Sequence, residues 1–216
     1  MRSTRDGPTL LAQRVATAAV GIPAIVALIW IGGWPYAIVA AVALAVAAAE
    51  FARMGFEPVR TLAGIAYVAL LGSTIILLRE LDNGRDWVYL ALFSTFAVDT
   101  AAYFTGRTIG RHTMAPAISP KKTWEGFAGG YAGGFAAALL LNYFLGLRID
   151  ATPAILIGAT LPAAAAAGDL FESWIKRRAG VKDASGLIPG HGGVLDRLDS
   201  LLFVFPAVYV VARWVA

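Results

Sequence analysis

Seven long apolar runs constrain this chain more than any other feature of its sequence. They cover residues 15–31, 36–49, 61–78, 87–105, 127–147, 151–174 and 198–215. A helix needs roughly 20 mostly apolar residues to cross a bilayer. Backbone polar groups inside a bilayer must be paired, and a helix pairs them within its own segment. The sequence therefore predicts an all-α fold: a polytopic integral membrane protein with about seven transmembrane helices.

The composition excludes the soluble classes of protein. Only 15% of the residues are charged and 58% are hydrophobic, whereas soluble domains carry about 25% charged residues. The chain has no cysteine, which excludes a disulfide scaffold and any chemistry based on thiols. In a soluble protein the net charge of +4 could indicate a nucleic-acid partner, but in a membrane protein the side on which each charge lies matters more than the sum. We therefore expect no nucleic-acid partner.

The basic residues are distributed unevenly between the two sides of the predicted bundle. Most of the 18 Lys and Arg residues fall on the side of the N-terminus. The exceptions are Arg79, Arg85, Arg148 and Arg213. Because cytoplasmic loops carry an excess of Lys and Arg, we expect the N-terminus inside, the C-terminus outside, and the long polar connections 106–126 and 175–197 in the cytoplasm. Residues 1–105 then form an N-terminal region of about four helices, and residues 106–216 carry both polar loops.

Asp99 is an ionisable residue within the fourth apolar run. Such groups are costly at membrane depth and usually face the protein interior. Helical spacing places Asp99 on one stripe with Ala102, Tyr103, Gly106 and Arg107. Two interpretations stay open. Asp99 is an internal hydrogen-bonding partner that holds two helices together, or it belongs to an anionic or metal-linked site near the cytoplasmic face.

The sixth apolar run ends in a second polar stripe. Asp169, Glu172, Ser173 and Lys176 share one face of a helix at this spacing. A purely structural stripe at this depth would more often use Ser, Thr or Asn. Two carboxylates beside a lysine therefore indicate a cation site next to a phosphate-sized anion.

A glycine-rich segment follows this stripe. Its glycines are Gly186, Gly190, Gly192 and Gly193. Glycine lets backbone N–H groups approach a ligand closely or adopt left-handed conformations, and such a loop leading into a helix suits phosphate binding. Asp196 and Asp199 come next at helical i, i+3 spacing and offer oxygen ligands suited to Mg²⁺. His191 either contacts a phosphate or caps the loop.

The earlier polar connection carries the paired Lys121 and Lys122. Paired lysines beside a membrane often act only as topology determinants or contact anionic lipid head groups, and this interpretation stays open beside a role in phosphate binding. Glycines with overlapping GxxxG spacing follow. They are Gly126, Gly129, Gly130, Gly133 and Gly134. We interpret them as a close-packing helix face and not as a nucleotide-binding loop.

The C-terminal half carries a dense pattern of charged, polar, glycine and apolar residues. Its residues are Ser173, Ile175, Lys176, Arg177, Lys182, Asp183, Ser185, Ile188, Pro189, His191, Gly192, Gly193, Val194, Asp196, Arg197, Leu198 and Asp199. This pattern resembles the signature of the phosphatidate cytidylyltransferase family, also called CDP-diacylglycerol synthases. Residues 119–126, Ser-Pro-Lys-Lys-Thr-Trp-Glu-Gly, and the stretch from Asp99 to Arg107 are similar to further family blocks. Many members of the family carry eight or nine spans, so this chain differs in length.

The resemblance implies that the protein transfers a cytidylyl group from CTP to phosphatidic acid, releases pyrophosphate and forms CDP-diacylglycerol. It implies Mg²⁺ as the essential ion, with K⁺ as a candidate second ion. Asp169 and Asp196 would be the main metal ligands, with Asp199 and Glu172 in support. The expected catalytic residues are Asp169, Asp196, Lys176 and Arg197. The residues expected to bind substrate are Ser119, Lys121, Lys122, Ser173, Lys182, Asp183, His191, Gly192, Gly193 and Asp99.

The expected partners are CTP, phosphatidic acid and the lipid bilayer, and the resemblance also suggests a homodimer. The expected location is a bacterial inner membrane with the active site facing the cytoplasm. One alternative is the same chemistry on an archaeal-type isoprenoid ether glycerol phosphate. A transporter is a second alternative, but it would show interrupted helices in two related halves, and the sequence has no such repeat. A non-enzymatic scaffold would have no need for Asp169, Lys182, His191 and Asp196 together.

Overall fold

The computed structural model describes residues 8–188 and 190–215. Arg2, Arg5 and the signature residue Pro189 lie outside the described residues. The described chain forms helices and one small antiparallel sheet. The helices are α1 (Pro8–Ile31), α2 (Gly33–Ala52), α3 (Pro58–Arg79), α4 (Gly84–Ile109), α5 (Trp124–Phe144), α6 (Ala151–Arg178), α7 (Leu195–Leu198) and α8 (Leu201–Val215). The strands are β1 (Thr113–Ala115) and β2 (Ser119–Thr123).

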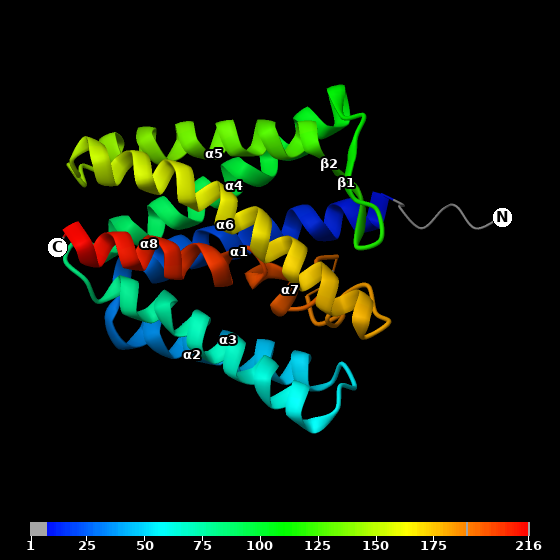
Figure 1. Ribbon diagram of the computed structural model, residues 1–216. Helices are drawn as coiled ribbons and strands as arrows, with labels where there is room; N and C mark the ends of the chain where they lie inside the picture. The colour runs from blue at the N-terminus through cyan, green and yellow to red at the C-terminus, as the bar shows by residue number, and fades with distance from the viewer. Residues whose placement is uncertain (1–7, 189, 216) are drawn as a thin grey trace.

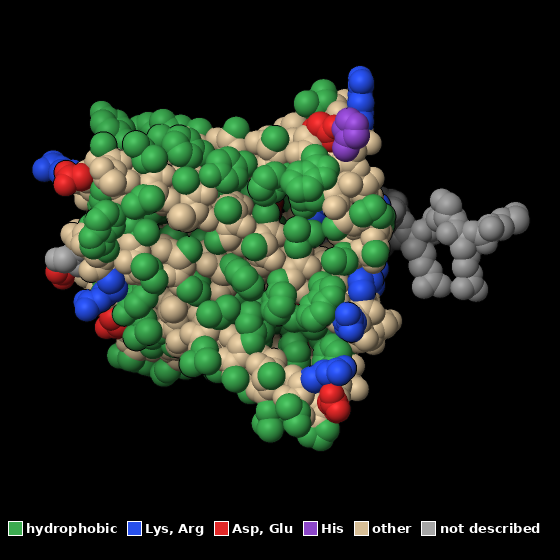
Figure 2. Space-filling model, in the orientation of Figure 1, with side chains coloured by type: hydrophobic (Ala, Val, Ile, Leu, Met, Phe, Trp, Pro, Cys, Tyr) green, Lys and Arg blue, Asp and Glu red, His purple; other side chains and the backbone are tan. Residues whose placement is uncertain are grey.

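Each predicted apolar run overlaps with one of the long helices. Within the described residues, five segments are long and apolar enough to cross a membrane: α2, α3, α4, α6 and Leu195–Val215. Figure 2 shows hydrophobic side chains along the length of the bundle on the face in view, with charged side chains gathered at its two ends. This distribution is that of a protein embedded in a bilayer. The protein is therefore an all-α integral membrane protein, as the sequence predicts.

The helices pack as a chain of neighbours around one core. In Figure 1, α4 and α5 form one side of the bundle, α2 and α3 form the other, and α6 and α8 lie between them. The centre of the core is made where α4, α6 and α8 meet, by Leu90, Ile157, Leu161, Val204 and Val208, all of which are buried. The charged side chains of α6 all lie in its C-terminal part, beyond this apolar centre.

The glycine face of α5 packs directly on α4, as predicted. A methyl group added to Gly130 would lie 2.9 Å from the Cβ of Ala102 and 3.0 Å from the carbonyl oxygen of Val98. One added to Gly126 would lie 3.2 Å from the Cα of Gly106. Small residues allow such a close approach of two helix backbones. This contact fixes the end of α4 beside the start of α5, and so fixes the β-hairpin (residues 113–123) that connects them.

The polar elements gather at one end of the bundle. Figure 1 places the β-hairpin, α7 and the segment that joins α6 to α7 at the end where α1 begins, while the chain ends at the opposite end. The two-stranded hairpin is an addition to the predicted helices, and it pairs Thr113 with Thr123 and Ala115 with Ser119.

A break also separates α7 from α8, where the predicted run continues from residue 198 without interruption. Asp199 Oδ1 accepts a hydrogen bond from the N–H of Ser200 at 2.7 Å. A local side-chain bond of this kind competes with the helical hydrogen bond.

Candidate functional site

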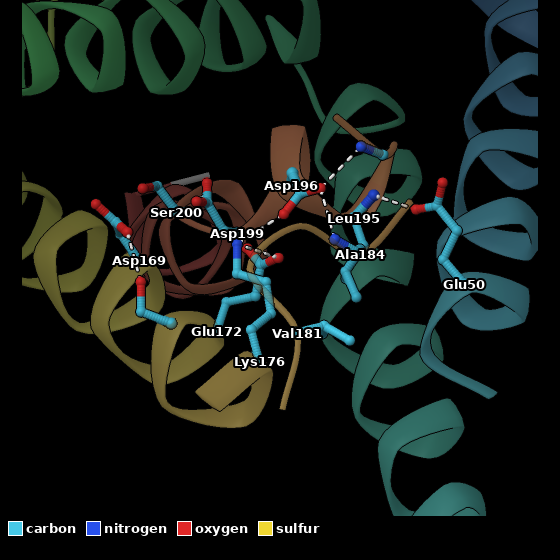
Figure 3. Close-up of polar contacts among 12 residues, drawn as sticks. Glu50, Asp169, Glu172, Lys176, Val181, Ala184, Leu195, Asp196, Asp199 and Ser200 are labelled. Atoms are coloured by element: carbon cyan, nitrogen blue, oxygen red, sulfur yellow. Dashed lines mark hydrogen bonds and ion pairs between the residues drawn. The ribbon is translucent and has the colours of Figure 1, made fainter. Parts of the chain in front are cut away.

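Lys176 lies between two buried carboxylates where α6 meets α7. Its Nζ is 2.6 Å from Asp196 Oδ1 and 3.1 Å from Glu172 Oε1. The side chains of Glu172 and Asp196 are 1% and 4% exposed, and that of Lys176 is 11% exposed. Figure 3 shows Lys176 extending from α6 toward both acids. Buried charges require partners. The ammonium group of Lys176 is the partner of both carboxylates, which come from two different helices.

Asp196 organises residues 179–194, which we call the signature loop. Its Oδ2 accepts hydrogen bonds from the N–H of Ala184 at 2.9 Å and the N–H of Gly193 at 2.7 Å. Gly192 has a φ of +81°, and a Cβ there would lie 2.7 Å from Asp196 Oδ2. Glycine is therefore required at position 192 both for its backbone conformation and for the space beside Asp196. The loop folds around this one carboxylate.

Asp169 connects α6 to the β-hairpin. Its carboxylate forms an ion pair with Lys122 of β2 and accepts a hydrogen bond from Ser173 Oγ at 3.4 Å. A second contact holds the hairpin to α6, because the guanidinium Nε of Arg177 donates to the carbonyl oxygen of Ile118 at 3.2 Å. The hairpin lysines therefore lie beside the acidic stripe of α6, although about 50 residues separate them in the chain.

Glu125 anchors the other side of the β-hairpin, just before the predicted span 127–147. Its carboxylate is 2.5 Å from His112 Nδ1 and accepts hydrogen bonds from the N–H groups of Arg111 and His112. The bond to the His112 side chain, together with the backbone N–H groups, lowers the pKa of Glu125 to about 2. The carboxylate therefore stays ionised at neutral pH and keeps the hairpin attached to the start of α5.

A polar cavity of about 660 Å³ opens between α4, α5, α6 and the β-hairpin. The predicted stripe from Asp99 to Arg107 lines one wall of this cavity, and Ser119, Lys121 and Lys122 line another. Asp169 lines it from α6. The cavity thus has two lysines and an arginine around a space of nucleotide size, which suits a polyanionic ligand.

A second cavity, of about 530 Å³, lies between α1, α2 and α4 on one side and α7 and the start of α8 on the other. Its outer walls are apolar, with side chains such as Ile25, Leu28 and Val39, so we call it the hydrophobic cavity. Asp196, Arg197 and Asp199 line its polar end. Asp99 and Asp169 line both cavities. The two spaces therefore meet at these two carboxylates.

The carboxylates at this junction can hold a hard cation such as Mg²⁺ only if water or substrate phosphates complete its coordination. Within the described residues, no three acidic or histidine side chains converge as a ready-made metal site. Asp169 and Asp199 both line the hydrophobic cavity. Oε2 of buried Glu172 lacks a hydrogen-bond partner in the described structure, whereas Oε1 pairs with Lys176. Mg²⁺ is usually bound by one or two carboxylates and completed by water and substrate phosphates. The donor set fits an ion held in that manner.

Several predicted site residues lie away from the two cavities. Lys182 and Asp183 are exposed on the signature loop and line neither cavity. The N–H of His191 donates to the carbonyl oxygen of Ile188 at 2.9 Å. The glycine-rich pattern predicts backbone N–H groups that bind a ligand, but the N–H of Gly193 donates to Asp196 instead. The roles of these four residues in substrate binding stay predictions.

Glu50 is the residue of this region that the motifs did not single out. It lies near the end of α2 and is 3% exposed, yet it contacts the signature loop, more than 130 residues later in the chain. The sequence does contain a sign that Glu50 has a structural role, because Glu50 directly follows the apolar run 36–49. A carboxylate at membrane depth indicates a specific partner. The sequence alone does not identify that partner.

The fold and the site define an integral membrane protein with a charged, phosphate-compatible site at one end of its helices. The sequence model of the cytidylyltransferase family matches residues 57–215. The chain therefore belongs to the cytidylyltransferase family.

Bacterial relatives agree with this assignment. The chain is 42% identical over 132 residues to a phosphatidate cytidylyltransferase of Mycobacterium bovis, a match that covers 60% of this chain and 42% of the relative. Relatives of the same name from Bacillus subtilis and Staphylococcus saprophyticus are 40% and 37% identical. Those matches cover 74% and 69% of this chain, and 58% and 57% of the relatives. The chain thus spans about half the length of the curated relatives it matches.

Proposed function

We propose that the protein transfers a cytidylyl group from CTP to phosphatidic acid, giving CDP-diacylglycerol and pyrophosphate. The relatives named phosphatidate cytidylyltransferase support this choice of reaction. The observation that carries it is the meeting of two different cavities at Asp99 and Asp169. A reaction between a water-soluble triphosphate and a membrane lipid needs a polar space and an apolar space that share the reacting centre.

The polar cavity suits CTP because Lys121, Lys122 and Arg107 line it and can neutralise phosphate charge. The hydrophobic cavity suits the acyl chains of phosphatidic acid because its walls come from the apolar faces of α1, α2 and α4. The lipid phosphate would then lie near Arg197 at the polar end of that cavity. Each substrate would reach the shared carboxylates from its own side.

The chemistry requires positioning and charge neutralisation more than a strong base. A phosphate monoester carries close to two negative charges at neutral pH, so its oxygen is already a nucleophile. This oxygen attacks the α-phosphorus of CTP, the bond from that phosphorus to the oxygen of the β-phosphate breaks, and pyrophosphate leaves. Lysine and arginine side chains around the junction would hold the two polyanions together and stabilise the charge that develops on the leaving group.

We also propose that Mg²⁺ binds at the junction, held by Asp169 and Asp196 with Asp199 and Glu172 in support. The ion would supply charge neutralisation on the α-phosphate and the leaving pyrophosphate. In the described structure Lys176 shares Asp196 Oδ1, and two N–H groups occupy Oδ2, so Asp169 is the more accessible of the two main ligands. K⁺ is the proposed second ion.

The proposed topology has seven spans, formed by α1 to α6 and α8, with the site in the cytoplasm of a bacterial cell. Two observations support it. The β-hairpin and the signature loop lie at the same end of the bundle as the start of α1 (Figure 1), and that end carries most of the Lys and Arg residues, as cytoplasmic ends do. The division into an N-terminal membrane region, residues 1–105, and a catalytic region, residues 106–216, and the homodimer, belong to the same proposal.

Radiolabelled CTP tests the reaction and the lipid at once. Purified protein in detergent would receive either phosphatidic acid or an isoprenoid ether glycerol phosphate, and lipid-extractable label would be counted. We expect label in the lipid fraction with phosphatidic acid. Label with the ether lipid alone would replace the proposed substrate. No label with either lipid, under conditions in which a known phosphatidate cytidylyltransferase is active, would contradict cytidylyl transfer.

Lys121→Ala tests whether the β-hairpin binds substrate. Lys121 is exposed and lines the polar cavity, so we expect the KM for CTP or for phosphatidic acid to rise about tenfold, the magnitude of one lost bond to a charged group. Steady-state kinetics with each substrate varied would measure it. Arg60→Ala is the matched control, because Arg60 is also exposed and cationic but is paired with Glu57 on α3. An unchanged KM for both substrates would leave Lys121 as a topology determinant only.

A further inference from the structure

Glu50 is a buried carboxylate whose three hydrogen-bond donors all belong to a distant part of the chain. Its Oε1 accepts from Ser185 Oγ at 2.6 Å and from the N–H of Val194 at 3.1 Å, and its Oε2 accepts from the N–H of Leu195 at 2.8 Å. Figure 3 shows Glu50 reaching from α2 toward the start of α7. Both carboxylate oxygens of Glu50 therefore accept hydrogen bonds, and all three donors are neutral groups.

These contacts satisfy polar groups that the fold would otherwise leave unpaired. The first N–H groups of a helix have no partner within the helix, and the N–H groups of Val194 and Leu195 lie at the start of α7. An ionised acceptor makes stronger bonds to such groups than a neutral one. Because Leu195 and Glu50 are both buried, water does not readily replace the carboxylate, and losing a buried partner costs about 1–3 kcal/mol per group.

The space around Glu50 is also fitted to it. A Cβ at Gly193 would lie 2.7 Å from both carboxylate oxygens. Real Cβ contacts are not this short, so any larger residue at position 193 would displace either the loop or Glu50. The requirement for glycine at position 193 therefore follows from Glu50 in α2, without any ligand.

The same short segment is held from its other side by the charged cluster. The N–H of Gly193 donates to Asp196 Oδ2, and Asp196 Oδ1 pairs with Lys176. Residues 193–196 are thus fixed between Glu50 of α2 and Lys176 of α6. Movement of this segment away from α2 would move Asp196 relative to Lys176, and with it the polar end of the hydrophobic cavity.

We propose that Glu50 is a positioning residue that holds the signature loop and Asp196 in their working arrangement. Glu50 lies before the residues that match the family, 57–215, so the α1–α2 pair contributes to the site and is more than a membrane anchor. The effect on turnover rests on the proposed function. The effect on loop structure does not.

Glu50→Gln tests this inference with little change in size. The Gln amide keeps one acceptor oxygen but places an NH₂ group against N–H or O–H donors, so at least one of the three bonds is lost. Hydrogen–deuterium exchange of the purified protein should show faster exchange in peptides covering residues 184–198, with unchanged exchange in the β-hairpin. In the activity assay, kcat should fall at least about tenfold while the KM for CTP changes less than twofold.

Glu57→Gln is the matched control. It makes the same chemical change seven residues later, at an exposed carboxylate paired with Arg60 at 2.9 Å, and should alter neither exchange in residues 184–198 nor kcat. Ser185→Ala provides a milder variant that keeps the carboxylate and removes one donor. It should give a smaller rise in exchange in the same peptides, and it keeps the inference testable if Glu50→Gln does not fold.

Two results would overturn the inference. One is exchange in residues 184–198 that stays at the wild-type rate in both variants. The other is faster exchange confined to α2 and α3, which would make Glu50 a packing residue of the helices. A wild-type protein without phosphatidate-dependent turnover would instead contradict the proposed function, and the exchange measurement would still decide the role of Glu50.

Discussion

Asp169→Asn should reduce CTP-dependent turnover by about 100-fold or more while the protein still inserts and purifies normally. Asp169 is only partly buried, lines both cavities and pairs with Lys122. Its replacement removes one negative charge from the place where we propose the cation and both substrates meet, and such charge stabilisation contributes several kcal/mol to the barrier. Initial rates at saturating CTP and phosphatidic acid, compared with the wild type, would measure the loss.

Asp82→Asn is the control for this prediction, because Asp82 is an exposed carboxylate in the connection between α3 and α4. It should keep wild-type turnover. Asp196→Asn is a less selective test, since Asp196 also pairs with Lys176 and accepts two backbone bonds from the signature loop. If Asp169→Asn keeps more than half of the wild-type rate, Asp169 does not hold an essential ion.

Lys176→Met should both unfold the site and remove activity. The change leaves Glu172 and Asp196, which are 1% and 4% exposed, without their shared cation. Breaking a buried ion pair by removing one partner costs about 3–5 kcal/mol, because an uncompensated charge remains in the interior. We therefore expect a clearly lower Tm in detergent, measured by the thermal unfolding of the purified protein, together with loss of turnover.

A second substitution separates the two effects of Lys176. In Lys176→Met/Glu172→Gln, one of the two uncompensated carboxylates is neutral, so part of the lost Tm should return while activity stays absent. Asp196 would still lack its cation. A Tm that falls further in the double variant would show that Glu172 is not the source of the instability, and a wild-type Tm in Lys176→Met would show that the cluster tolerates the loss of its cation.

The sequence predicts the long helices well because a bilayer imposes a simple rule on them. Apolar runs of suitable length must form helices, and the runs at 61–78 and 151–174 correspond to α3 and α6. The acidic stripe extends α6 to Arg178 without interruption, since polar residues at helical spacing continue a helix beyond the membrane. The glycines of α5 also pack as expected, because their spacing leaves one face without side chains.

The arrangement of the site is less accessible to sequence reasoning, since its contacts join residues that are far apart in the chain. Nothing in the spacing of Lys122 and Asp169 indicates that they pair, and the β-hairpin that brings them together lies in a short connection outside the apolar runs. The motif likewise predicts a metal-binding role for Asp196, but it does not indicate that Asp196 is the centre of the loop's hydrogen bonds. The motifs do not indicate Glu50, because two of its three donors are backbone N–H groups, which carry no sequence signal.

Pyrophosphate release from CTP is the most direct measurement of the central claim that the two cavities bring CTP and a lipid phosphate to one centre. With purified wild-type protein, release should depend on added phosphatidic acid and should equal the CDP-diacylglycerol formed, mole for mole. In Asp169→Asn, the release that depends on phosphatidic acid should be slower by about 100-fold or more. Release that proceeds equally without phosphatidic acid, or CDP-diacylglycerol that does not match the pyrophosphate, would contradict the account.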